Sequence, residues 1–322
     1  MKISDLRFVV GVLLLACATG TQPVRTSVSA TLSDSLTTGV MPLLPKDTGR
    51  FVAPVPVGPI SGPGEVVEPV PGGTVDWGGR VVRARGTGVA DPGAENKAQA
   101  RLMAERAAIV VAQRNLLEII KGIRIDSDSK VENYLTTYDV IYTHVDGIIR
   151  GARLVGPTKF DSVAGTAEVE MEVALTGPQS VAEALTPALT QPGVAEMVSS
   201  GSPAVAEFFR QYSGLVLDAG NSGLKPALFP KIYDESGNLL LDTRDYAGRH
   251  GEAVVQFVTK LDQVLARPEF AHQPLVLKVK QVRGRLGADI VLSRQDAERL
   301  KWLKQGARWL FDTGRFIVKL LM

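Results

Sequence analysis

Apolar and polar residues alternate in two segments of the chain, and this alternation predicts two strands of one β-sheet. The segments are GRVVRARGTGVA at residues 79–90 and GTAEVEMEVALTG at 165–177, where glutamates alternate with apolar residues. Residues 148–160 (IIRGARLVGPTKF) predict a further strand just before the second segment. Residues 131–147 fit a helix and a strand equally well, so the pattern leaves that segment open.

A long amphipathic helix is predicted between these strands, over residues 95–122. Leu102, Ile109 and Leu116 share one side of this helix, and we expect that side to pack on the sheet. Gly122 provides a natural C-terminal end. One helix against an antiparallel sheet makes the first half of the chain an α+β domain.

The second half of the chain predicts another α+β domain. The turn Asp234–Gly237 joins two short apolar segments and predicts a hairpin. Residues 252–266 (EAVVQFVTKLDQVLA) predict a helix, and Ser293 followed by Asp296 predicts the capped start of another. Further strands are expected at 274–284 (PLVLKVKQVRG), 288–293 (ADIVLS) and 315–321 (RFIVKLL).

The expected fold class is therefore α+β, with two small domains at residues 77–176 and 213–322. Each is expected to pack its helices on a mostly antiparallel sheet. A linker rich in proline, glycine and alanine joins them over 177–212. Residues 17–76 contain a Ser/Thr-rich stretch and then a proline-rich one, which predicts a disordered tether, because proline removes backbone donors and favours extended structure.

The first 16 residues, MKISDLRFVVGVLLLA, have the short charged start and apolar run of a signal peptide. The apolar run is too short to span a bilayer. A small residue, Ala16, stands directly before Cys17, the one cysteine of the chain. This arrangement resembles the lipobox of bacterial lipoproteins, which implies lipidation of Cys17 and attachment to a membrane by the lipid. By resemblance to Gram-negative lipoproteins, Ala18 at the next position favours transfer to the outer membrane. The alternative is an ordinary secretory signal with an unmodified thiol.

Composition argues against several kinds of chemistry. The net charge is +2 and aromatic residues make up 6% of the chain, so we expect no nucleic-acid partner. The three histidines are isolated from one another, and a single cysteine cannot build a zinc site, so we expect no metal and no cofactor. Gly86 and Gly88 lack the third glycine of a dinucleotide-binding loop. We interpret Asp126–Lys130 (DSDSK) as a polar turn, because it only partly matches a calcium loop or a catalytic S-x-x-K motif.

Basic residues alternate along two of the predicted strands. Arg83 and Arg85 lie on the first strand, and Lys278 and Lys280 lie on a strand of the second domain. Such residues commonly form solvated faces or protect strand edges. Contact with an anionic polymer or another partner is the alternative function for these four residues.

The pattern ARGTGVADPGAENKAQARLMAERAAIVVAQRNLLEIIKGIRIDS, followed by VDGIIRGARLVG and a charged final strand, resembles the LPP-twenty surface lipoprotein family. The resemblance covers about residues 80–176 of this chain. The family includes the FlgP-like outer-membrane lipoproteins. The resemblance implies a small α+β domain, outer-membrane attachment and a role in surface or flagellar assembly without catalysis. We therefore expect a structural envelope lipoprotein, not an enzyme, which associates with itself or with envelope proteins. The alternative is a periplasmic module that binds an envelope polymer such as glycan.

Overall fold

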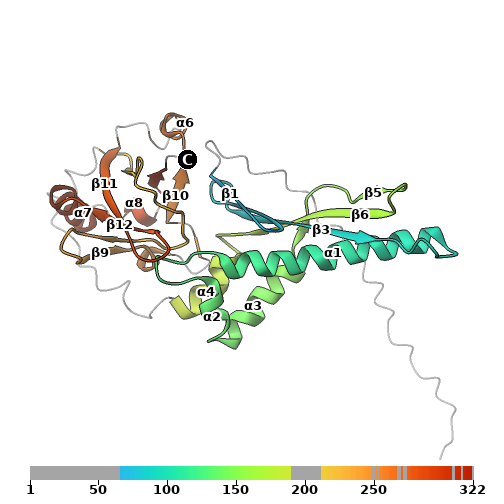
Figure 1. Ribbon diagram of the computed structural model, residues 1–322. Helices are drawn as coiled ribbons and strands as arrows, with labels where there is room; N and C mark the ends of the chain where they lie inside the picture. The colour runs from blue at the N-terminus through green and yellow to red at the C-terminus, as the bar shows by residue number, and fades with distance from the viewer. Residues whose placement is uncertain are drawn as a thin grey trace, which may run out of the picture. The chain divides into compact units, whose positions relative to one another are not determined.

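The computed structural model describes residues 66–189, 212–247, 251–252, 254–266, 270, 274–306, 309–312 and 315–320 (Figure 1). These residues form two α+β domains, which confirms the expected fold class. Among them, no helix is both long and apolar enough to cross a membrane. Cys17, most of the tether and the greater part of the linker lie outside the described residues.

The sheet of the first domain is antiparallel throughout and has six strands. Four of them follow in the order β1-β2-β3-β6, and both β4 and β5 pair with β6. Their bounds are β1 (Val67–Val70), β2 (Gly73–Asp76), β3 (Val81–Val89), β4 (Arg153–Leu154), β5 (Lys159–Asp161) and β6 (Thr166–Ala174). The long antiparallel neighbours β3 and β6 are the two alternating segments of the sequence, so that prediction is confirmed.

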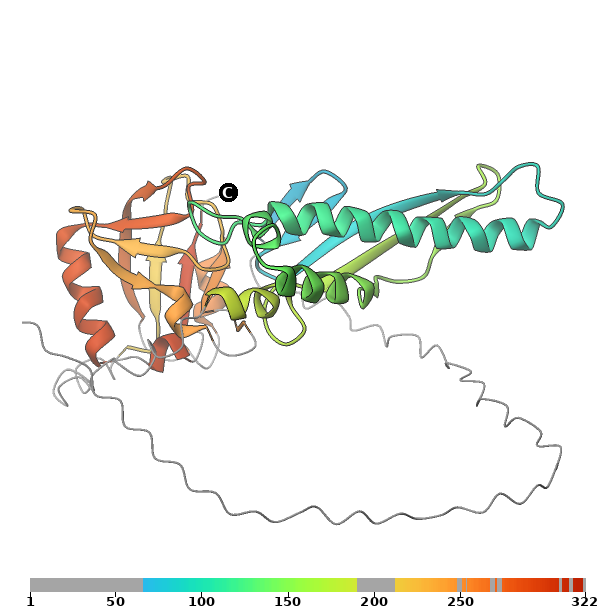
Figure 2. The same ribbon diagram turned by 90° about the horizontal axis from the view of Figure 1, so that it is seen from below.

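Helices cover this sheet on one side (Figure 2). They are α1 (Lys97–Gly122), α2 (Val131–Leu135), α3 (Asp139–Arg150) and α4 (Val181–Leu189). Asn96 caps the start of α1, because its side chain accepts a hydrogen bond from the backbone N–H of Gln99 at 3.1 Å. The segment that the pattern left open is helical, as α2 and α3. Residues 148–150, which were predicted to be strand, also belong to α3.

The side of α1 that packs on the sheet differs from the predicted one. Leu116 is buried as expected, but Leu102 is 60% exposed. The alanines at positions 100, 104, 108 and 112 face the sheet instead. They approach β3 at Gly86 and Gly88, where an added Cβ would lie 2.1 and 2.0 Å from helix carbonyl oxygens. The helix backbone thus lies directly on the strand, and only small residues fit between them.

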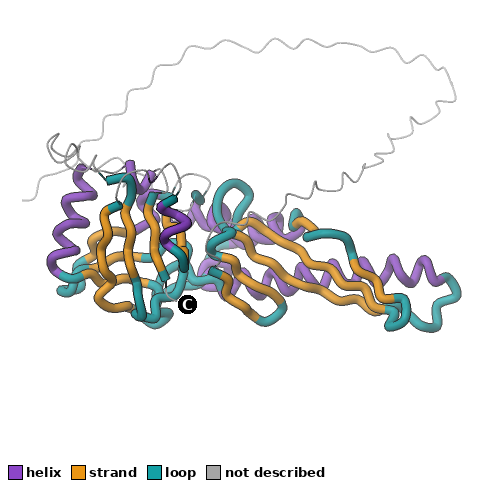
Figure 3. Tube along the Cα trace, turned by 90° about the horizontal axis from the view of Figure 1, so that it is seen from above, coloured by secondary structure: helices purple, strands orange, loops and turns teal. Residues whose placement is uncertain are grey.

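The second domain contains a seven-stranded mixed sheet with the order β10-β13-β7-β11-β12-β8-β9 (Figure 3). The strands are β7 (Leu215–Asp218), β8 (Lys231–Tyr233), β9 (Leu239–Asp242), β10 (Val255–Val258), β11 (Leu275–Arg283), β12 (Asp289–Leu292) and β13 (Phe316–Lys319). The helical segments are η1 (Thr243–Tyr246), α6 (Leu261–Leu265), α7 (Arg294–Gly306) and α8 (Trp309–Asp312). The predicted hairpin β8–β9 and the Ser293 cap of α7 are confirmed.

Most strand pairs in this second sheet are parallel, so the expectation of a mostly antiparallel sheet is wrong here. β7 lies between its parallel partners β11 and β13. β10 also pairs in parallel with β13, and β8 pairs in parallel with β12. The apolar segments of β7, β12 and β13 are buried, which is typical of parallel strands covered on both faces. The helix predicted over 252–266 is also wrong in its first half, because Val255–Val258 is the strand β10.

Two predicted domain boundaries need correction. Residues 67–76, assigned to the tether, form the hairpin β1–β2, which continues the sheet at β3. The prolines of this segment suggested an unfolded chain, but Pro69 stands in the edge strand β1, where a missing N–H is tolerated. Residues 181–189, assigned to the linker, form α4, which buries Val181 and Leu185.

A pair of leucine substitutions tests which side of α1 faces the core. Leu116→Ala should lower the free energy of unfolding by about 2–5 kcal/mol, because Leu116 is fully buried. The matched control Leu102→Ala should cost less than about 1 kcal/mol, because Leu102 is largely exposed. Chemical denaturation followed by circular dichroism measures both. Equal losses would contradict the observed orientation of the helix.

Candidate functional site

The described domains meet where the chain leaves α1. The backbone of residues 124–127 is hydrogen-bonded to the second domain: Arg124 O accepts from Leu228 N at 3.0 Å, and Ile125 O accepts from Phe229 N at 2.8 Å. Ser127 O accepts from Leu286 N at 2.9 Å. We call residues 124–127 and the second-domain residues that they contact the joint.

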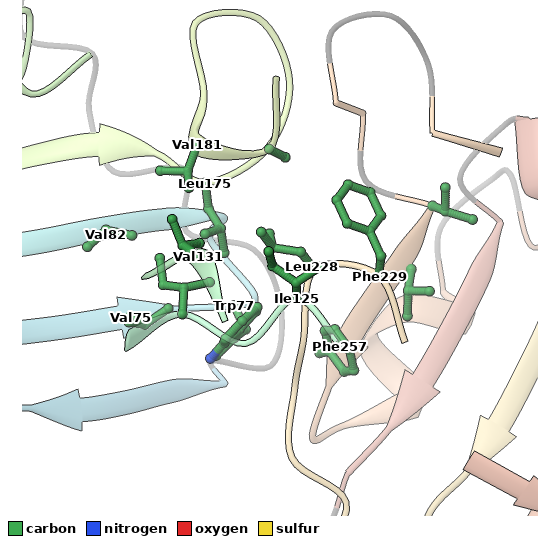
Figure 4. Close-up of a cluster of buried hydrophobic side chains, with 14 of the residues drawn as sticks. Val75, Trp77, Val82, Ile125, Val131, Leu175, Val181, Leu228, Phe229 and Phe257 are labelled. Atoms are coloured by element: carbon green, nitrogen blue, oxygen red, sulfur yellow. The ribbon is translucent and has the colours of Figure 1, made fainter. Parts of the chain in front are cut away.

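Apolar side chains from both domains fill the core beside the joint (Figure 4). Ile125 is fully buried and lies near Leu228 and Phe229 of the second domain. Trp77 of the first domain contacts Phe257 of the second edge to face, with ring centroids 6.0 Å apart. The two domains therefore share one continuous buried core.

Ser127 provides the densest set of polar contacts at the joint. Its hydroxyl donates to Arg283 O at 2.5 Å and accepts from the backbone N–H groups of Ala288 and Asp289 at 2.9 and 2.6 Å. Gly284, with a positive φ of 83°, turns the second-domain loop close to this serine. A Cβ on Gly284 would lie 2.1 Å from the Cβ of Ser127. The turn therefore requires glycine both for its conformation and for the space that Ser127 occupies.

Asp126 forms the ion pair of the joint. Its carboxylate accepts from Lys231 Nζ at 2.8 Å and from the backbone N–H groups of Asp128 and Ser129, each at 2.9 Å. Burial alone would raise the pKa of Asp126, but the hydrogen bond from Lys231 and those from its own turn hold it below the ordinary value. The pKa of Lys231 is likewise raised by Asp126, against the effect of burial.

Asp289 is a second buried carboxyl at the joint. Its Oδ1 accepts from the backbone N–H groups of Lys231 at 3.0 Å and Ser127 at 3.3 Å. Burial raises the pKa of Asp289 to about 6, and the negative charge of Asp126 contributes to the rise. The ammonium group of Lys231 is bonded to Asp126. Asp289 therefore relies on neutral backbone donors, which compensate burial of its charge incompletely.

A third polar contact lies at the edge of the joint, around Glu68 on β1. The guanidinium of Arg124 forms two hydrogen bonds with this carboxylate, and Trp77 Nε1 donates to it at 3.1 Å. Arg124 Nε also donates to Pro226 O of the second domain at 2.7 Å. Burial would raise the pKa of Glu68, but Arg124 holds it below the ordinary value. Strand β1, which was expected to be part of the tether, therefore supplies the carboxylate that holds Arg124 at the joint.

This arrangement supports binding between domains better than catalysis. The hydroxyl of Ser127 is fully buried and already has three hydrogen-bond partners, so it is not presented to a substrate. The interpretation of Asp126–Lys130 as a polar turn is confirmed by the hydrogen bonds that Asp126 makes with Asp128 and Ser129. Within the described residues, no group of three or more His, Cys, Asp or Glu side chains could hold a metal ion.

Arg83 and Arg85 lie side by side on β3, where each faces a glutamate of β6. Arg83 Nε lies 3.2 Å from Glu172 Oε2, and Arg85 Nε lies 3.3 Å from Glu170 Oε1. Glu172 also pairs with Arg153 at 3.0 Å. These side chains form ion pairs across the outer face of the sheet, which reduces the positive charge that either arginine offers to a polymer.

Lys278 and Lys280 lie in the other sheet, on β11, so the structure does not unite the four basic residues in one site. Both side chains are exposed. Lys280 pairs with Glu235 at 3.0 Å, and the backbone N–H of Lys278 donates to Asp296 at 3.4 Å. Cys17, the predicted lipidation residue, and two of the three histidines lie outside the described residues.

An exposed apolar surface runs along α1, although the sequence pattern predicted that one of its residues, Leu102, packs on the sheet. Leu102, Met103 and Val110 are 60%, 58% and 47% exposed, and we call these three residues the outer face of α1. They turn away from the alanines that pack on the sheet. The signal for this orientation was present in Gly86 and Gly88, which permit close packing of alanine but not of leucine.

The described surface contains depressions in both the helical layer and the region beside the joint. A groove of about 670 Å³ lies between α3 and α4 and is lined by Ile148, His144 and Glu183 among others. A smaller one of about 270 Å³ lies beside Trp77 and Arg124. Glu183 is engaged in capping α4, because its carboxylate accepts from Gln179 N at 2.6 Å and its own N–H donates to Ser180 Oγ at 3.1 Å. The carboxylate of Glu183 in the larger groove therefore has a structural role.

A known family matches part of the chain, within the second domain. The family described as the second domain of Treponema pallidum Tp0624 matches residues 214–318, about a third of the chain. The match begins just before β7 and ends within β13. It therefore includes Leu228, Phe229 and Leu286, whose N–H groups bond to residues 124–127. No curated protein matches the chain.

Substitution of Ser127 tests the contribution of the joint to stability. Ser127→Ala leaves one buried carbonyl and two buried N–H groups without their shared partner, each at a cost of about 1–3 kcal/mol before relaxation. We expect the full chain to lose about 2–4 kcal/mol of unfolding free energy. The control Ser162→Ala, at an exposed turn, should stay within about 0.5 kcal/mol of wild type. A small effect of Ser127→Ala would show that the joint is not important for stability.

Proposed function

We propose that this protein is a lipid-anchored outer-membrane protein with a structural or assembly role in the bacterial envelope. The observation that carries the proposal is the exposed apolar surface that we call the outer face of α1. Exposed apolar side chains that cluster on one element are typical of protein contact sites. The resemblance of residues 80–176 to the LPP-twenty family, which includes flagellar lipoproteins, supports the same reading and makes a flagellar role one form of it.

The proposed anchor is a lipid on Cys17. The apolar run before Cys17 has the length of a signal peptide, and the small residue Ala16 precedes the thiol. Two or more acyl chains bind a bilayer stably, because each buried CH₂ contributes about 0.8 kcal/mol. The residues between Cys17 and Val66 would then connect the lipid to the folded domains.

The proposed partner of the outer face of α1 is a second copy of the chain or another envelope protein. Leu102, Met103 and Val110 form an apolar strip along the helix, with Arg106 beside it. Burying such side chains between proteins releases water and stabilises association. Binding of an envelope polymer such as glycan is the second candidate. It has less support at Arg83 and Arg85, which pair with glutamates, than at the exposed Lys278.

Replacement of the proposed lipidation residue tests the anchor. In Cys17→Ser, lipid attachment is impossible, so the protein should move from the membrane fraction to the soluble fraction or remain unprocessed. Wild-type protein should carry acyl groups detectable by mass spectrometry. If Cys17→Ser still sedimented with the membranes and the wild type carried no acyl groups, the proposed anchor would be refuted.

Charge substitutions in the outer face of α1 test association. Wild type in mild detergent should run as an oligomer or a complex in size-exclusion chromatography with light scattering. The double variant Met103→Glu with Val110→Glu should run as a smaller species with almost unchanged thermal stability, because both side chains are exposed. The control Val163→Glu, at a 97% exposed turn residue, should leave the assembly intact. A monomeric wild type, or an unchanged assembly in the double variant, would count against this surface as the contact.

A further inference from the structure

Two buried carboxyl groups lie close together at the joint, one from each domain. Asp126 is 3% exposed and Asp289 is 1% exposed. Lys231 donates its side-chain ammonium to Asp126 at 2.8 Å and only its backbone N–H to Asp289 at 3.0 Å. A joint with two carboxylates and one directly bonded ammonium carries an uncompensated negative charge when both acids are ionised.

We propose that protonation of Asp289 strengthens the joint between the two domains, so that the coupling of the domains depends on pH. Asp289 loses its contacts with Ser127 and its burial beside Asp126 if the first-domain segment leaves the second domain. Its carboxyl then returns to water, where the ionised form is well solvated. Opening of the joint and ionisation of Asp289 therefore favour each other.

The other charged or titratable groups at the joint surround both carboxyls. They come from the first-domain turn, from β8, from η1 and from the end of β11, and they are Asp128, Lys231, Tyr233, Arg244 and Arg283. Arg244 is bonded to Asp242, and Arg283 lies over the ring of Tyr233 at 4.5 Å. These cations are thus engaged with other groups and are not hydrogen-bonded to Asp289.

The sign of the effect follows from the two acids. Asp289 has a pKa of about 6 in the closed joint against an ordinary value of 3.8. The stabilisation of the closed joint by protonated Asp289 is therefore complete below pH 3.8 and is lost as the pH rises through 6. Asp126 has a lowered pKa, so its ion pair is present above its ordinary value and is lost at more acidic pH. The joint should therefore be tightest in weakly acidic solution and should loosen toward neutrality and above.

Hydrogen exchange of the purified full chain in mild detergent tests the proposal. The amides of Leu286, Ala288 and Asp289 bond to Ser127, and their exchange, corrected for the intrinsic rate at each pH, reports opening of the joint. We expect opening to increase by about 10-fold between roughly pH 5 and pH 8. In Asp289→Asn, which keeps the accepting oxygen but cannot ionise, this dependence should be absent. The control Asp161→Asn, at an exposed turn, should behave as wild type.

A wild type without this pH dependence, or an Asp289→Asn variant that retains it, would overturn the proposal. If Asp289→Asn fails to fold, the carboxyl carbon of Asp289 can be titrated directly by NMR in the wild type. A midpoint near pH 6 would support the proposal, and a midpoint at or below about pH 4 would overturn it.

Discussion

The carbonyl groups of Arg124, Ile125 and Ser127 accept hydrogen bonds from the second domain, and the arrangement of the two described domains depends on these bonds. Buried peptide groups need partners, since an unpaired one costs about as much as a lost hydrogen bond. Here the N–H groups of Leu228, Phe229 and Leu286 supply them. Two regions that look like separate modules in the sequence thereby become one folded unit with a shared core, in which Ile125 and Trp77 lie beside side chains of the second domain.

The joint also bears on the proposed structural role of the protein. With the second domain fixed to the end of α1, the remaining length of that helix lies on the antiparallel strand pair β3 and β6 (Figure 2). The close contact at Gly86 and Gly88 leaves no space for larger side chains, so leucine and methionine turn outward. A stable support that presents an apolar helix surface suits a protein that assembles with others, and this links the packing of the first domain to its proposed role.

The sequence predicts individual elements well and their mutual contacts poorly. Alternation identifies β3 and β6, because one face of each strand is polar. It cannot identify which side of α1 is buried, because Leu102 and the alanines are all apolar and the choice depends on the glycines of another element. The prolines around the hairpin β1–β2 predict an unfolded segment, so the hairpin is not recognised from the sequence. The segment that forms β10 is predicted to be helical, because the spacing of its apolar residues fits both a helix and a strand.

The joint itself is harder to predict, because its residues have a sufficient local explanation. The segment Asp126–Lys130 is a polar turn in sequence and in structure, and nothing in its spacing indicates that Ser127 also bonds to residues more than 150 positions away. The positive φ of Gly284 and the buried Asp289 acquire their roles only when the two regions meet. Long-range complementarity of this kind is not encoded in the period of either segment.

The central claim is that the two domains form one cooperative unit. Tryptophan fluorescence tests it most directly, because Trp77 reports on the first domain and Trp302 on the second. Two variants of the full chain that each retain one of these tryptophans, with the others changed to phenylalanine, can be unfolded in denaturant. Coincident transitions with the same midpoint are predicted. Two separated transitions, in which Trp302 completes its change while part of the Trp77 change is left for a second step, would contradict the account.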